Sequence, residues 1–276
     1  MPRKKKVEEQ KPHLTEEQVE AMTTEEEKEV EEQEELTPEE DARRASRSFL
    51  ASVATQFQTI QRVRVAVGLS IKSRERYGHR VDPRMVNLHG MMLDVEGSVV
   101  EYMRDEVEKQ PEIYAWLTSI QGIGLRTAAM LIGLIDIRRS ASVSALWKFS
   151  GLGVTNGHAD KRESGVKLCY SMRLKKTMYL VARGLIMSGN KLYVGIYRES
   201  KEKYAREHPE WLRNEKGKEI KGGKLHVDLA ARRRMLKIFA QHLWITWREI
   251  EGLPVSKPWV HEHGGHVDLI PPPPRP

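Results

Sequence analysis

Apolar residues recur at three- and four-residue steps along most of the chain after residue 48, and this periodicity restricts the fold more than any other feature. The first such segment runs through Phe49, Val53, Phe57, Ile60, Val63, Val67 and Ile71. This spacing places apolar side chains on one face of an α-helix, whereas strict alternation would indicate strands. No segment alternates over a sustained length, so the sequence predicts an all-α fold.

Residues 47–110 are expected to form a long helical arm. The polar segment Ser73–Asp82 separates two helical patterns, and Pro83 suits the first turn of the second helix. That helix continues through Met92, Val95, Val99, Met103 and Val107. Two long helices with a short connection pack most simply as an antiparallel, coiled-coil-like hairpin. A homodimer through this arm is a further expectation.

The helical domain that follows is expected to cover residues 111–250. Pro111 restarts the chain, and helices are predicted over 142–149, 168–187, 191–207 and 228–250, with Asp228 capping the last. Residues 150–165 are expected to form a Gly-rich loop. Phe239, Trp244 and Trp247 fit a core better than a stacking surface. The Pro-rich residues 251–276 predict an extended tail.

Charge divides the chain into two unlike parts. Residues 1–46 contain 8 Lys/Arg and 16 Asp/Glu, a net charge of −8, and predict a disordered acidic tail. The remainder contains 38 basic and 23 acidic residues, a net charge of +15. A folded part this basic attracts polyanions, of which nucleic acid is the commonest in a cell. The tail either competes with DNA for the basic part or only increases solubility.

The segment Ser119–Ile135 predicts a helix-hairpin-helix. Gly122 and Gly124 flank Ile123 between two apolar helical segments, a pattern that permits a tight turn and a close backbone approach. The second helix would begin at the turn, so its unpaired N–H groups could hold a phosphate while Ile123 enters the core. A tight turn without a ligand is the alternative interpretation.

Candidate DNA-binding residues occur at the hairpin and in two basic stretches beyond it. Hydroxyl, guanidinium, ammonium and backbone N–H groups all suit phosphate contacts. The candidates are Gln121, Gly122, Ile123, Gly124, Arg126, Thr127, Lys161, Arg162, Lys167, Arg173, Lys175, Lys176, Arg232, Arg233 and Arg234. A solvated helix face is the alternative for the helical ones. Arg232–Arg234 would stand near a helix N-terminus, where positive charge is unfavourable unless an anion binds.

Residues 117–186 resemble the C-terminal domain of insertion-sequence transposases of the DEDD-type IS-one-ten class. The matching stretches are the hairpin Ser119–Ile135, Ala145–Phe149, Ser150-Gly151-Leu152, Glu163-Ser164-Gly165, and Tyr170–Ile186 with its basic residues. The resemblance covers about a quarter of the chain, and the helical arm also resembles that family's coiled coil. It implies a protein of mobile-element recombination that binds DNA.

The same resemblance implies that Ser164 is a catalytic nucleophile. Members of that family also have an N-terminal resolvase-like domain of RNase H type, which supplies four acidic residues. Nothing before Phe49 in this chain could form that domain. We therefore expect DNA binding without catalysis by the chain alone. The enzymatic alternative is a recombinase or nuclease subunit that uses Ser164 with a partner's acidic domain, and a divalent metal would then be needed.

Three further expectations concern partners and location. Structured RNA is the alternative nucleic acid, because the resembled transposases use a guide RNA. His261, His263 and His266 could bind a metal, although loop histidines are more often merely polar, and no cofactor is expected. The lone Cys169 and the absence of a long apolar run favour a cytoplasmic, nucleoid-associated protein that does not enter membranes.

Overall fold

The computed structural model describes residues 37–155, 158–160, 165, 167–214, 216–256 and 270–276. The chain divides into two units, residues 1–44 and 45–276. The first unit is described only from Thr37. Within the described residues the structure is all-α apart from one short strand pair, which confirms the predicted fold class.

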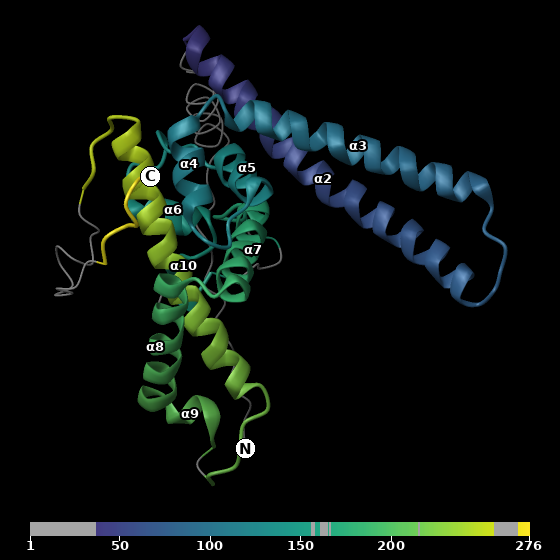
Figure 1. Cartoon of the computed structure of the whole chain (residues 1–276). Helices are drawn as coiled ribbons and strands as arrows, with labels where there is room; N and C mark the ends of the chain where they lie inside the picture. The colour runs from purple at the N-terminus through teal and green to yellow at the C-terminus, as the bar shows by residue number, and fades with distance from the viewer. Residues whose placement is uncertain (1–36, 156–157, 161–164, 166, 215, 257–269) are drawn as a thin grey trace, which may run out of the picture. The chain divides into compact units, whose positions relative to one another are not determined.

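The predicted arm consists of α2 (Pro38–Arg76) and α3 (Pro83–Val107). They lie side by side in opposite directions (Figure 1). Ser46 Oγ donates to Glu106 near the base at 2.5 Å, and Arg64 pairs with Glu96 further along. Asp82 caps α3 by accepting from the Arg84 N–H, and Pro83 occupies its first turn. Because α2 begins at Pro38, residues 38–46 are helical rather than part of a disordered tail.

Only the base of the arm has a buried face. Leu50, Ala54 and Phe57 of α2 and Met103 and Val107 of α3 are buried. Toward the tip, the predicted apolar stripe is only partly covered. Beyond the base, the two helices cover only the side on which they touch each other.

The helix-hairpin-helix is formed by α4 (Pro111–Ser119) and α5 (Leu125–Leu134). Ile123, between the two helices, is 4% exposed, as predicted, and Ala128 and Ala129 are fully buried. The other end of α5 crosses α2 so closely that a Cβ on Gly133 would lie 2.6 Å from the Ala51 nitrogen. This crossing fixes the base of the arm to the helical domain.

The next segment contains α6 (Val143–Phe149) and a two-residue antiparallel pair, β1 (Val154–Thr155) with β2 (His158–Ala159). The pair lies within the stretch expected to be irregular. Helix α7 (Met172–Ser188) follows, with its first turn capped by Ser171 accepting from the Leu174 N–H at 3.2 Å. Gly189 then ends α7 in the left-handed conformation, as helix C-termini often require.

The C-terminal helices are α8 (Lys191–Glu207), the single turn α9 (Pro209–Leu212) and α10 (Gly223–Ile250). One detail differs from expectation, because α10 begins five residues before Asp228. Asp228 therefore lies inside the helix, where it binds Tyr197 and Lys201 of α8 and Arg232 of α10. The predicted core residues Phe239, Trp244 and Trp247 are buried, as expected.

Residues 270–276 have no regular secondary structure and return to the core. Trp116 of α4 donates its indole N–H to the Pro273 carbonyl at 3.0 Å. His242 lies 2.9 Å from the Ile270 carbonyl through Nε2 and 3.0 Å from the Tyr193 hydroxyl through Nδ1. A carbonyl can only accept, so Nε2 carries the proton and Nδ1 accepts from Tyr193. Burial lowers the pKa of His242 to about 4, which keeps the ring neutral.

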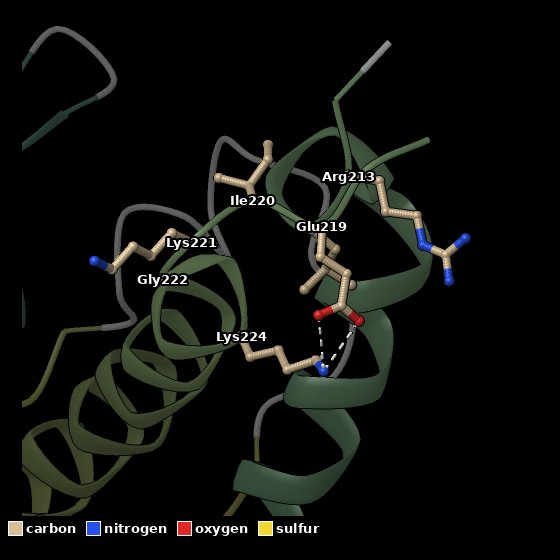
Figure 2. A pocket seen from close by; sticks show the side chains of 7 residues that line it. Arg213, Glu219, Ile220, Lys221, Gly222 and Lys224 are labelled. Atoms are coloured by element: carbon tan, nitrogen blue, oxygen red, sulfur yellow. Dashed lines mark hydrogen bonds and ion pairs between the residues drawn. The ribbon is translucent and has the colours of Figure 1, made fainter. Parts of the chain in front are cut away.

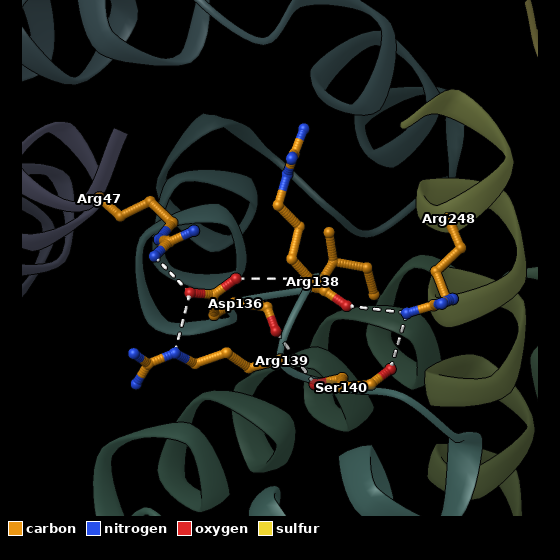
Figure 3. A network of polar contacts seen from close by, with 7 residues as sticks. Arg47, Asp136, Arg138, Arg139, Ser140 and Arg248 are labelled. Carbon is orange, nitrogen blue, oxygen red and sulfur yellow. Dashed lines mark hydrogen bonds and ion pairs between the residues drawn. The ribbon is translucent and has the colours of Figure 1, made fainter. Parts of the chain in front are cut away.

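The loop between α5 and α6 connects the arm to α10 (Figure 3). Asp136 pairs with Arg47 of α2 at 2.5 Å and lies 3.9 Å from Arg139. Arg248 of α10 is 6% exposed and donates to the Ser140 carbonyl at 3.1 Å. The arginines of this network thus hold helices together.

Candidate nucleic-acid interface

The turn of the helix-hairpin-helix lies against the C-terminal end of α7. Gln121 Nε2 donates to the Ser188 carbonyl at 2.7 Å, and the Gln121 carbonyl accepts from Ser188 Oγ at 3.1 Å. Gly122 has a φ of +103°, and a Cβ there would lie 2.6 Å from the Gly184 carbonyl oxygen. The glycine at 122 is therefore required by a helix-to-turn contact, a packing role that the sequence interpretation did not foresee.

Gly124 and the first turn of α5 remain open. Gly124 is exposed, has an ordinary extended backbone, and has no atom within 4 Å of where a Cβ would stand. The N-terminus of α5 has no side-chain cap. A helix start of this kind directs N–H groups and a partial positive charge outward. The hairpin thus retains one edge that can face an anion.

Arg126 differs from expectation. Its guanidinium donates to Gln61 Oε1 of α2 at 3.2 Å and lies 5.7 Å from the centre of the Phe57 ring. These contacts turn the side chain toward the base of the arm, so its position does not support the predicted phosphate contact. Thr127, the other first-turn residue, is half-buried.

The exposed face of α7 is a basic surface beside the turn of the hairpin. Arg173, Lys176 and Arg183 are exposed along it, and Tyr179, between the second and third, is 53% exposed. The sequence of α7 contains no acidic residue. Positions 176, 179 and 183 follow helical spacing and share one face. Cations with an interleaved aromatic ring suit both phosphates and the flat faces of bases.

A second group of cations lies where α7, α10 and the loop after α6 meet. Arg233 donates to the carbonyls of Gly151, at 3.4 Å, and Gly153, and Lys175 Nζ lies 3.4 Å from the Asp160 carbonyl. Lys237 Nζ stands 4.9 Å from the centre of the Trp147 ring. We call Lys175, Arg233 and Lys237 the interhelix cation cluster.

Burial disfavours the charged forms of two cations in this cluster. Burial lowers the pKa of Arg233, and burial together with the charge of Arg233 lowers the pKa of Lys237. The Asp160 carboxylate opposes both shifts. A phosphate beside the cluster would reduce the repulsion between its cations, because opposite charge favours the protonated form.

The three consecutive arginines of α10 have different surroundings. Arg232 pairs with Asp228 at 2.7 Å, Arg233 belongs to the interhelix cation cluster, and Arg234 is exposed. They lie in the third turn of α10 rather than at its start. The expected conflict with the helix dipole therefore does not arise, and Arg232 is explained by the contact between α8 and α10.

Other sequence candidates are not brought into this region by the described structure. Lys167 is exposed before α7. Six other candidates lie outside the described residues: Lys161, Arg162, Ser164, His261, His263 and His266.

Within the described ranges, no group of three or more His, Cys, Asp or Glu side chains could hold a metal ion. No helix there is long and apolar enough to span a membrane.

A hollow of about 400 Å³ lies at the turn before α10, and it is lined neither by the basic residues of α7 nor by the interhelix cation cluster. Figure 2 shows Lys224 reaching the Glu219 carboxylate, at 3.1 Å, while Arg213 and Lys221 point outward on either side. The charges at this hollow do not converge on a common point, so it does not resemble a small-molecule site.

Some residues of the interface are only weakly marked in the sequence. Tyr179 could have been found, because it lies three residues after Lys176 and four before Arg183. Lys237, Trp147 and Asp160 come together only through tertiary packing. No sequence signal joins residues separated by 90 positions, as Trp147 and Lys237 are, before the fold is known.

No protein-family profile, no curated protein and no solved structure is similar to this chain.

Proposed function

We propose that this protein binds DNA through its phosphate backbone, without reading base sequence. The observation that carries the proposal is the acid-free exposed face of α7, with Arg173, Lys176 and Arg183. The turn before α5 contacts the end of the same helix through Gln121 and Ser188, and Lys175 of the interhelix cation cluster lies in its first turn. Cations without acidic neighbours on their own helix suit the evenly spaced charges of a duplex.

The resemblance to transposases suggests recombination as the process, and a nucleoid location in the cytoplasm follows from the same proposal. Strand cleavage is not part of the proposal, and Ser164 lies outside the described residues. A homodimer through the arm belongs to the proposal as well.

The decisive experiment replaces Arg173, Lys176 and Arg183 together with glutamine. A duplex-binding titration over a range of salt concentrations then measures how many phosphates are neutralised. The slope of log affinity against log salt should become shallower by about 0.9 for each lost phosphate contact, or nearly three for the triple variant. An unchanged slope in a folded variant would reject this interface.

The matched control replaces Lys216, Lys218 and Lys221, which are exposed in the turn before α10, with glutamine. This variant loses the same charge and should retain most of the slope. Structured RNA titrated in parallel provides the alternative outcome. Binding that prefers RNA over duplex DNA at every salt concentration would replace DNA as the proposed partner.

A further inference from the structure

The arm has one face that is apolar and carries no charged side chain between Phe49 and Val67 of α2 and between Leu88 and Tyr102 of α3. On α2 this face consists of Phe49, Val53, Ile60, Val63 and Val67, and on α3 of Leu88, Met91, Val95 and Tyr102. We call these nine residues the arm face. Met91 is 57% exposed, Val95 50% and Val63 45%. Side chains of this size gathered on one surface of an isolated chain indicate a binding surface.

The two helical stripes lie on the same side of the arm. On α2, Ile60, Val63 and Val67 each come one residue before Gln61, Arg64 and Gly68, which contact α3. On α3, Leu88 and Val95 each come one residue before His89 and Glu96, which contact α2. In two antiparallel helices, the residues that come one position before the contact residues are rotated toward the same side of the pair.

The spacing on this face follows heptads. Val53, Ile60 and Val67 are seven residues apart on α2, and Leu88, Val95 and Tyr102 are seven apart on α3. Seven-residue apolar spacing is the pattern by which helices pack along their length against other helices. The opposite side of the arm also has exposed apolar residues, but Arg62 and Arg104 interrupt it. The partner that fits the arm face is therefore another helical pair.

Charge along the arm identifies that partner and its direction. The tip, residues 62–84, has seven basic and two acidic residues, a net charge of +5. The base of α3, residues 94–109, has six acidic and two basic residues, a net charge of −4. A second copy turned end for end would place each basic tip over the other copy's acidic base, whereas a parallel pair would place like charges together.

We propose that two copies of this chain pair through their arm faces in an antiparallel, two-fold arrangement that forms a four-helix bundle. The contact is self-complementary, as a two-fold interface requires. Because the base of each arm is fixed to its helical domain where Ala51 meets Gly133, the pairing places the two domains at opposite ends of the bundle. If the proposed DNA binding holds, each dimer carries two separate binding surfaces and bridges two duplexes.

The first test measures the mass of the full chain in solution by sedimentation equilibrium at several concentrations. The wild type should have twice the 31.8 kDa of one chain. The double variant Val63→Glu/Val95→Glu places charge on the arm face and should have the mass of one chain. Both side chains are about half exposed, so circular dichroism should show the native helix content. A wild type that stays monomeric throughout would overturn the pairing.

The matched control is the double variant Val65→Glu/Leu93→Glu on the opposite side of the arm, where the residues are 43% and 46% exposed. It introduces the same charge and should remain dimeric. If both double variants dissociate, or neither does, the arm face is not the interface. All of these outcomes are read without DNA, so they are independent of the proposed function.

The direction of pairing is tested with a zero-length carbodiimide linker in a mixture of ¹⁴N- and ¹⁵N-labelled copies. The copies carry Arg84→Lys, because position 84 stands seven residues before Met91 and Asp105 stands fourteen residues after it, so both continue the arm face on α3. Within one copy 21 residues of helix separate the two positions, about 30 Å. Mixed-isotope links from the introduced amine to Asp105 are expected. A dimer that lacks these links would overturn the antiparallel arrangement.

Duplex bridging distinguishes the two proposals. The wild type should capture a second labelled duplex on a bead-bound one, whereas Val63→Glu/Val95→Glu should bind one duplex and capture no second. Loss of all DNA binding by the monomeric variant would contradict this division of roles between arm and domain.

Discussion

The arm and the helical domain follow the same apolar periodicity but bury very different amounts of it. Met91 and Val95 of the arm are half exposed or more, whereas Trp116 and Trp244 of the domain are fully buried. In the domain, α10 is covered by α4, α6, α7 and α8. In the arm, each helix beyond the base touches one other helix. Periodicity thus shows which apolar side chains share a helix face, and the number of neighbouring helices decides whether that face is buried within one chain.

The largest expected difference between the two regions is in stability. Trp244→Ala should lower the free energy of unfolding by about 4 kcal/mol, because it removes a buried side chain and leaves a cavity. The indole also donates a 2.7 Å hydrogen bond to the Ser140 carbonyl. Met91→Ala in the arm should cost less than about 0.5 kcal/mol in a monomer. Urea unfolding of both variants in the monomeric Val63→Glu/Val95→Glu background measures the contrast, and equal losses would contradict it.

The turn of the hairpin should be nearly as sensitive, and at one glycine rather than at both. Gly122→Ala should lower the free energy of unfolding by about 3 kcal/mol, since its Cβ meets the Gly184 backbone and its φ is +103°. Gly124→Ala meets no atom and has an extended backbone, so it should change stability by less than about 1 kcal/mol. Thermal unfolding of the two variants is the comparison. Similar losses would mean that the turn does not pack on α7 as described.

Acid should destabilise the helical domain through His242. Its pKa is about 4 in the folded protein and 6.5 when unperturbed, so above pH 6.5 both folded and unfolded states hold a neutral ring. As the pH falls from 6.5 to 4, the unfolded chain takes up a proton that the folded one does not. Stability should therefore decrease by about 2.5 kcal/mol between pH 7.5 and 4.5.

Urea unfolding at both pH values, in the wild type and in His242→Gln, measures this contribution. Glutamine does not titrate, so the variant should be less stable at pH 7.5 and should lose the histidine part of the pH dependence. A wild type and variant with parallel pH profiles would show that His242 does not remain neutral in the folded state.

Much of the helix layout was predictable because its signals are local. The prolines at 83 and 111 open α3 and α4, and α8 has the predicted bounds. The start of α10 was misplaced because Asp228 is a good capping residue, yet its carboxylate is used by Lys201 and Arg232 across the contact with α8. Long-range partners overrode a local preference there.

The candidate interface divides in the same way. The basic character of α7 and the turn at Gly122–Gly124 are visible in the sequence, because charge and glycine spacing are local properties. The sequence alone also determined that the chain is helical and that the part after residue 46 carries the net positive charge. Only the tertiary structure decided that Gly122 serves packing against Gly184, that Arg126 holds α2, and that Lys175, Arg233 and Lys237 converge. The physical reason is that helical periodicity specifies a face, whereas the side chain's partner is specified by which distant helix covers that face.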